Sequence, residues 1–182
     1  HDVFALHHAT PLVLPGVTPI RADLRRRGSL RRALAVKPDA VVHLAAKVKG
    51  VDALALNRQM MRVMLELERP IVYASSTVVH WSRDTAYGTS RREGESALAE
   101  SGLPYAIVRP SAPYGRRLIG HAPGHTESFH TLAGLVRRSR VVPVIGDGRY
   151  RRQPIHVDDL SDTILALLER GLTGQALDAG GA

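Results

Sequence analysis

The sequence predicts an α/β fold, in which a doubly wound parallel sheet carries helices on both faces. Short apolar runs alternate with helical patterns along the whole chain, as a series of βαβ units requires. Runs such as 40–44 (AVVHL) and 105–109 (YAIVR) are apolar almost throughout, which is typical of strands buried on both faces of a parallel sheet. The sequence has no internal repeat and no low-complexity linker, so we expect residues 1–182 to form one domain.

The first half of the chain is expected to hold four strands and two helices. Ser29 can cap a short helix that Pro38 ends, and the second helix has a methionine-rich face. Strands are expected at residues 3–6, 17–21, 40–44 and 70–74, and helices at 30–36 and 52–68.

The second half continues the alternation and ends in a short strand. A Gly- and His-rich loop at 115–125 precedes a helix that reaches about Arg140. Asp158 or Asp159 is expected to cap the last helix, which ends at Arg170. Strands are expected at 105–109, 144–148 and 175–178, and a further helix at 87–100.

Charge and cysteine content limit the classes of function. The net charge is +8 at pH 7, almost all of it from arginine, which favours phosphate-bearing ligands or nucleic acid as partners. The charges are scattered and only 4% of residues are aromatic, so RNA binding is the weaker alternative. The lack of cysteine excludes disulfides and thiolate metal sites and fits the cytoplasm. No apolar run approaches the ~20 residues that span a bilayer.

The segment from Tyr87 to Arg91 is the strongest candidate for chemistry. Residues four apart on a helix share a face, so the phenol and the guanidinium are expected to lie together. A nearby cation lowers the pKa of a phenol from about 10, which proton exchange near neutral pH requires. Ser76, at the end of the preceding strand, adds a hydroxyl. Together these groups can move a proton to or from a carbinol oxygen.

Each of these residues also has a purely structural interpretation. A lone tyrosine more often packs its ring against the core at the start of a helix, and Ser75-Ser76-Thr77 can simply end a strand. Because the two motifs follow neighbouring elements in register, we favour the functional interpretation. His121, His125 and His130 lie in or near one loop, but their pattern lacks the logic of a metal-ligand set, so no metal site is predicted.

These motifs, with others in the same order, resemble the extended short-chain dehydrogenase/reductase family, which contains nucleotide-sugar epimerases and dehydratases. The resemblance covers nearly the whole chain and implies a Rossmann-like fold with an NAD or NADP cofactor. The matching segments are Asp23-Leu24, His43-Leu44-Ala45-Ala46, Asn57, Tyr73 to Thr77, Tyr87 to Arg91 with Glu93-Gly94-Glu95, Arg109-Pro110-Ser111 with Tyr114-Gly115, and Ile155 to Asp159.

The resemblance also implies roles for individual residues. Tyr87 corresponds to the catalytic acid/base, and Ser76 to the hydroxyl that holds the substrate oxygen, with Thr77 as the alternative. Arg91 occupies the place of the lysine that binds the nicotinamide ribose and assists the tyrosine. The remaining expected cofactor contacts are Leu44, Ala45 and Ala46 at the ribose and phosphates, Asp23 and Leu24 at the adenine, and Pro110 and Ser111 near the nicotinamide.

The sequence departs from the family in three places. Arginine replaces lysine at position 91, and the two cations are not interchangeable at a precise site. The loop between Ser76 and Tyr87 is shorter than is usual. The chain also contains no glycine-rich dinucleotide fingerprint, so the run at 3–6 matches the family's second strand and the first βα unit is missing.

The missing strand is central in the family's sheet, so its loss leaves two open strand edges and no helix N-terminus for the pyrophosphate. Either the chain is an excerpt of a longer protein, or the flanking strands close up and cofactor binding suffers. We favour an excerpt, because the sequence begins at His1 without methionine. On this interpretation residues 111–182 supply only part of a substrate-binding lobe.

The leading hypothesis is an NAD(P)-dependent oxidoreductase, epimerase or dehydratase that acts on a sugar nucleotide or another small hydroxyl or carbonyl compound. His7 stands where NAD-binding relatives carry an acid, so NADP is slightly favoured because nothing there repels a 2′-phosphate. The alternative is a non-catalytic member of the same fold that binds or senses the cofactor. A homodimer is left open.

Overall fold

The computed structural model describes residues 2–116, 128–139, 141, 144, 146–149 and 153–181, with the backbone alone for Arg27 and residues 128–130. The main sheet has four parallel strands in the order β3-β4-β5-β8. They are β3 (Val41–His43), β4 (Ile71–Ala74), β5 (Tyr105–Pro110) and β8 (Gln175–Ala179). The prediction of a parallel α/β sheet is confirmed.

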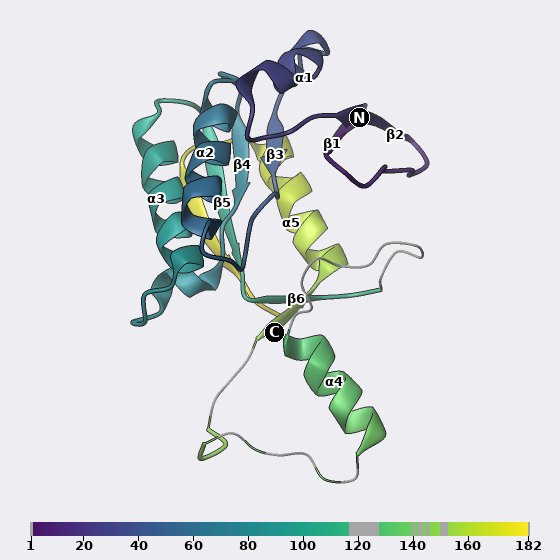
Figure 1. Ribbon diagram of the computed structural model, residues 1–182, viewed down its shortest axis with the longest axis vertical. Coiled ribbons are helices and arrows are strands. Elements are labelled where there is room, and N and C mark those ends of the chain that lie inside the picture. The colour runs from purple at the N-terminus through teal and green to yellow at the C-terminus, as the bar shows by residue number, and fades with distance from the viewer. Residues whose placement is uncertain are drawn as a thin grey trace.

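Two further pairs of parallel strands lie outside this sheet. β1 (Val3–His7) pairs with β2 (Val17–Arg21), and β6 (Ala112–Tyr114) pairs with β7 (Pro154–His156). Figure 1 shows β1 and β2 apart from the main sheet, on the side of β3. Within the described residues β1 and β3 do not pair, so the two strands that flank the expected gap have not closed up.

Helices cover both faces of the main sheet, as a doubly wound fold requires (Figure 1). Successive side chains of a strand point to opposite faces, so each strand contributes to two clusters. Ile71 and Tyr73 pack in the cluster that α2 (Ala53–Leu65) and α3 (Ala86–Glu100) cover. Val72 packs in the opposite cluster, under α5 (Val157–Arg170).

The expected cap at Ser29 is wrong. The helix α1 (Arg31–Ala35) follows a 3-10 turn, η1 (Arg27–Leu30), and begins two residues after Ser29. The Ser29 hydroxyl donates to the carbonyl of Asp23 at 2.6 Å and accepts from the backbone N–H of Asp23 at 2.9 Å. Ser29 therefore does not cap a helix, because its hydroxyl is bonded to the backbone of Asp23, six residues upstream.

The expected cap of α5 is also wrong. The N-cap is His156, whose Nδ1 accepts from the backbone N–H of Asp158 at 3.3 Å, and both aspartates lie in the first turn. There their carboxylates still interact favourably with the positive, N-terminal end of the helix dipole. The strand expected at 144–148 is not seen in the described residues of that range, where Gly146–Gly148 form a turn.

Two shorter elements complete the described part of the chain. A 3-10 turn, η2 (Thr77–His80), follows β4, and α4 (Ser128–Arg138) lies below the main sheet near β6 (Figure 1). Most of the Gly- and His-rich loop lies outside the described residues. Among the helices that are described, none has the length and hydropathy to cross a membrane.

Candidate functional site

Tyr87 lies in the first turn of α3, where the local sequence fixes the start of the helix. The hydroxyl of Thr85 accepts from the backbone N–H of Gly88 at 2.9 Å, which satisfies one of the donors that every helix start leaves open. The Tyr87 ring is half-buried. The cap thus places the phenol next to the carboxyl end of β4.

Arg91, one turn further along α3, lies under the ring of Tyr87. Its side chain is 1% exposed, and its Cζ is 5.0 Å from the Tyr87 ring centroid and 5.2 Å from that of Tyr73. Its Nη1 donates to the carbonyl of Ala74 at 3.1 Å, while its buried Nε has no hydrogen-bond partner. The structure therefore brings Tyr87 and Arg91 together, as the four-residue spacing predicts.

Two more aromatic side chains continue the stack below Arg91. His43 and Tyr73 face each other with ring centroids 5.6 Å apart, and both are buried. Burial lowers the pKa of His43 to about 4, with the nearby charge of Arg91 as a second cause. Burial also raises the pKa of Tyr73 to about 12, which the charge of Arg91 partly opposes. Both rings are therefore neutral near pH 7.

Gly94 makes room for the Tyr73 hydroxyl beneath α3. A Cβ at position 94 would lie 2.5 Å from the hydroxyl oxygen of Tyr73, whose side chain is 2% exposed and has little room to move. We expect Gly94→Ala to lower the free energy of unfolding by about 1 kcal/mol or more, because overpacking outweighs the gain in helix propensity. Urea denaturation measures the change.

Two variants control this prediction. Gly134 lies inside α4, and among the described residues no atom beyond the helix's own backbone lies within 4 Å of an added Cβ, so Gly134→Ala should be neutral or stabilising. Adding Tyr73→Phe to Gly94→Ala removes the clashing oxygen and should recover part of the lost stability. An unchanged stability of Gly94→Ala would show that Tyr73 moves aside freely.

Ser76 and Thr77 lie at the start of η2, beside the first turn of α3. The Ser76 hydroxyl accepts from the backbone N–H of Val78 at 3.4 Å. A side chain of α3, Arg92, donates to the carbonyl of Val79 at 3.4 Å, which joins the two segments. No hydrogen bond joins Ser76 directly to Tyr87 in the described part of the chain, so the serine–tyrosine geometry depends on this packing.

Asn57 connects the loop after β3 to the same turn of α3. Its Oδ1 accepts from the backbone N–H of Lys47 at 2.8 Å, and its Nδ2 donates to the Lys47 carbonyl and to the Ser90 hydroxyl, both at 2.9 Å. Ser90 in turn donates to the carbonyl of Tyr87 at 2.7 Å. From the sequence, Asn57 was singled out only by the family resemblance. That its buried side chain joins the loop after β3 to α3 is visible only in the structure.

A chain of charged groups crosses the carboxyl ends of β4, β5 and β8. Arg109 donates to both carboxylate oxygens of Glu95, at 2.9 and 2.7 Å, and the Ser75 hydroxyl donates to the same carboxylate. Arg109 also reaches Asp178 at 3.3 Å, and His80 pairs with Asp178 at 2.9 Å. The hydrogen bond from His80, followed by that from Arg109, lowers the pKa of Asp178.

A second group of predicted residues lies at the carboxyl ends of β1 and β2. Asp23 follows β2, and its carboxylate accepts two hydrogen bonds from Arg25, each 2.8 Å long, with His8 3.6 Å away. These bonds lower the pKa of Asp23 well below its ordinary range. Leu24 packs against the core under α2, and the buried Nδ1 of His7 has no hydrogen-bond partner.

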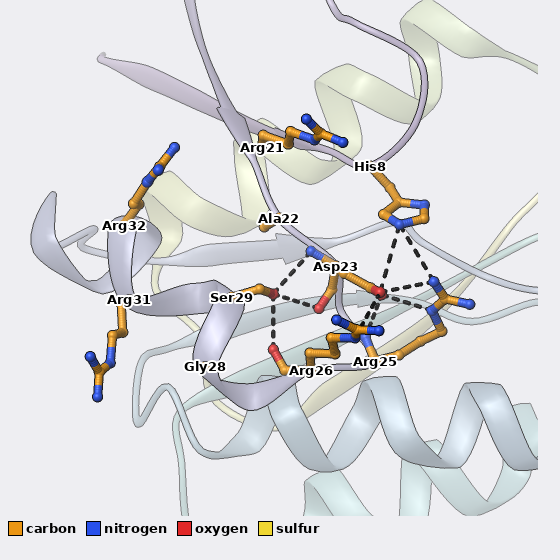
Figure 2. Close-up of a pocket in the computed structure, with 10 residues that line it drawn as sticks. All are labelled: His8, Arg21, Ala22, Asp23, Arg25, Arg26, Gly28, Ser29, Arg31 and Arg32. Atoms are coloured by element: carbon orange, nitrogen blue, oxygen red, sulfur yellow. Dashed lines mark hydrogen bonds and ion pairs between the residues drawn. The ribbon is translucent and has the colours of Figure 1, made fainter.

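A cavity of about 580 Å³ opens beside Asp23. Figure 2 shows Asp23, Arg25 and His8 on one side of it and Arg31 and Arg32 on the other. No individual role was predicted for the arginines that line this cavity, although their close spacing in 21–32 was the available signal. They are Arg21, Arg25, Arg26, Arg31 and Arg32.

The other predicted cofactor residues occupy the same edge of the main sheet. Leu44 is 63% exposed just beyond β3, with Ala45 half-buried and Ala46 exposed beside it. Pro110 ends β5 and is buried, and Ser111 donates its backbone N–H to Ala179 at 3.1 Å. His121 and His125 lie outside the described residues, and at the positions that are described no cluster of metal ligands is found.

A family model for the NAD-dependent epimerase/dehydratase family matches residues 1–180. The chain belongs to this family. A curated relative, a ceramide reductase of Caulobacter vibrioides, is 29% identical over 165 residues, which is 87% of this chain and 49% of that protein.

Solved structures show the same fold. The epimerase Mth375 of Methanothermobacter thermautotrophicus matches 98% of this chain and 64% of its own length, with a TM-score of 0.77 and 21% identity. The enzyme WbmH of Bordetella bronchiseptica, solved with NAD+, matches 98% of this chain and 67% of its own, with a TM-score of 0.73 and 16% identity. The chain thus spans about half to two thirds of the length of these proteins.

Proposed function

We propose that the protein is an NAD(P)-dependent oxidoreductase, epimerase or dehydratase that acts on a sugar nucleotide or another small hydroxyl or carbonyl compound. Family membership supports this proposal. The observation that carries it is the Tyr87–Arg91 pair, which sets a phenol and a buried cation together beyond the carboxyl end of β4. In open α/β sheets, ligands bind at this end of the strands.

Unpaired buried polar atoms lie in two of the residues expected near the cofactor. Among the described residues, three buried side-chain atoms lack a hydrogen-bond partner: His7 Nδ1, Arg69 Nε and Arg91 Nε. Two of them belong to His7 and Arg91, which are expected to lie at the cofactor. A buried polar atom left unpaired costs about 1–3 kcal/mol, so a ligand oxygen that reached these atoms would gain a hydrogen bond there.

In the proposed reaction each residue of the site has a separate role. A bound nicotinamide ring supplies the acceptor or donor of a hydride at the carbinol carbon. Tyr87 takes or returns the hydroxyl proton, and Ser76 holds the same oxygen. Arg91 places a positive charge beside the phenol, and Asn57 and Ser90 keep the first turn of α3 in position. Thr77 stays the alternative to Ser76.

We further propose that 111–182 supplies part of the substrate-binding lobe. β6 follows β5 directly, beyond the carboxyl end where Tyr87 lies, and the Ser111 hydroxyl donates to the Gln153 carbonyl next to β7. In Figure 1 β6 and α4 lie below this edge of the main sheet. This placement leaves the substrate between α3 and the lobe.

We propose NADP as the preferred cofactor because of the charge around the cavity beside Asp23. Five arginines and one aspartate line it, and Arg25 already neutralises that aspartate. No ion pair joins Arg21, Arg31 or Arg32 to an acid elsewhere in the described residues, so these charges are open to a ligand. A phosphate monoester gains more than a ribose hydroxyl from such surroundings.

Titration of the chain with NADP+, NAD+ and 2′,5′-ADP by calorimetry tests whether the chain binds a nicotinamide dinucleotide and whether it prefers NADP. We expect NADP+ to bind about tenfold or more tightly than NAD+, a difference of about 1.4 kcal/mol. Arg25→Met leaves the Asp23 carboxylate bare beside the 2′-phosphate and should remove most of this preference. Arg25→Met with Asp23→Asn should recover part of it, because the repelling charge is gone.

The matched control is Arg58→Met, which breaks a similar exposed pair with Glu93 between α2 and α3. It should leave both affinities unchanged. Equal affinities for NADP+ and NAD+ would contradict the preference, whereas the absence of binding by either would contradict the cofactor proposal for this chain. Binding without hydride transfer to any carbonyl or sugar-nucleotide substrate would favour the cofactor-sensing alternative.

A further inference from the structure

Arg91 is a buried cation without an acidic partner. Its contacts include the rings of Tyr73 and Tyr87 and the carbonyl of Ala74, and no ion pair to a carboxylate is formed within the described residues. A lone guanidinium in the interior is costly, because neither water nor a counter-ion compensates its charge. The groups packed around Arg91 must therefore compensate part of this cost.

The nearest acid along the helix is Glu95, four residues after Arg91. Opposite charges at this spacing normally pair on a helix surface. Here the Glu95 carboxylate turns to Arg109, which donates to both of its oxygens, and to the Ser75 hydroxyl. The side chains of Arg109 and Glu95 are only 20% and 13% exposed, so this pair is shielded from water. Arg109 thus pairs with Glu95, the acid that would otherwise neutralise the charge of Arg91.

Two further titratable groups beside Arg91, Tyr73 and His43, carry no charge near neutral pH. Burial raises the pKa of Tyr73, on β4, to about 12, and lowers that of His43, on β3, to about 4. The ring of Tyr73 lies on the guanidinium at 5.2 Å, and that of Tyr87 at 5.0 Å. Such contacts attract a cation to the ring face, and the attraction grows as water is excluded.

We propose that Tyr73 and Arg109 are positioning residues of this site. Tyr73 holds the Arg91 guanidinium against the ring of Tyr87, and Arg109 keeps Glu95 from cancelling its charge. The phenol of Tyr87 therefore faces a full positive charge instead of a neutral ion pair. This inference rests on the proposed role of Tyr87, but its test needs neither cofactor nor substrate.

The test is a pH titration of phenol ionisation by near-ultraviolet difference absorbance. Each variant is measured with and without Tyr87→Phe, so that the difference isolates one of the five tyrosines. Arg109→Met releases Glu95 to pair with Arg91 and should move the ionisation midpoint of this phenol upward. Arg109→Met with Glu95→Gln removes the released acid as well and should return the midpoint to that of the wild type.

Conservative variants separate positioning from folding. Arg109→Lys keeps a cation for Glu95, and Tyr73→Phe keeps the ring on Arg91, so both should titrate like the wild type. Tyr73→Leu removes one face of the stack and should raise the midpoint. Circular dichroism checks that each variant is folded, and if Tyr73→Leu does not fold, the two Arg109→Met variants still decide.

Two results would overturn the inference. One is a folded Arg109→Met variant with an unchanged midpoint. The other is a midpoint that stays displaced when Glu95→Gln is added, which would mean that Arg109 acts through structure alone. Failure of NADP+ to bind would count against the proposed function but would not change this titration.

Discussion

Replacing Tyr87 with phenylalanine is expected to lower kcat by about 10²–10⁴-fold, the usual contribution of a positioned acid/base. The affinity for NADP+ should stay the same, because phenylalanine keeps the ring that lies on Arg91. Only the hydroxyl that exchanges the proton is lost. Hydride transfer between NADP(H) and a panel of sugar nucleotides and small carbonyl compounds measures kcat, and calorimetry measures the affinity.

The matched control is Tyr105→Phe at the amino end of β5, where the hydroxyl faces Gly174 and not the carboxyl edge. This variant should keep full turnover. Full activity in Tyr87→Phe would show that another group moves the proton. A parallel loss of NADP+ affinity would instead assign the Tyr87 hydroxyl to binding.

The stability of the fold is expected to fall by about 3 kcal/mol between pH 7 and pH 4 because of His43 alone. Burial holds its folded-state pKa at about 4, against an ordinary value of 6.5. Between these values the unfolded chain binds a proton that the folded chain does not, so the free energy of unfolding drops as the pH falls. A difference of 2.5 pKa units corresponds to about 3 kcal/mol.

Urea denaturation across this pH range measures the effect by comparison with His43→Phe. Phenylalanine can keep the stack on Tyr73 but does not titrate, so the variant should lose this part of the pH dependence. His8→Gln, at a histidine whose side chain is 59% exposed, should retain it. Identical slopes for His43→Phe and the wild type would mean that the folded chain protonates His43 without cost.

The main sheet was predictable from the sequence because buried parallel strands are short, apolar and separated by helices. Strands β3, β4, β5 and β8 all lie within two residues of their expected positions. The two helix caps were not predictable in the same way. Ser29 and the aspartates of α5 are all good capping residues, and which polar group they bind depended on the path of the backbone around them.

In the candidate site, the local part was predictable and the distant part was not. The Tyr87–Arg91 contact follows from the helical period alone, since the two residues are one turn apart. The ring of Tyr73 below Arg91 comes from another element, and so does the Arg109 that binds Glu95. Pairing β4 with β5 in register brings these two strands together under α3.

For the arginines of the cavity beside Asp23, too, one part was predictable from the sequence and another part was not. Their number and sign could be read from the residues at 21–32, and with them a preference for anionic ligands. That Arg25 already neutralises Asp23, and that Arg21, Arg31 and Arg32 have no ion pair within the described part of the chain, appears only once η1 and α1 turn back beside β2. Periodicity and residue type thus specify the elements and the chemistry within one turn of helix. The partners of each charge were decided by strand register and chain reversal, because these bring together residues that no local pattern relates.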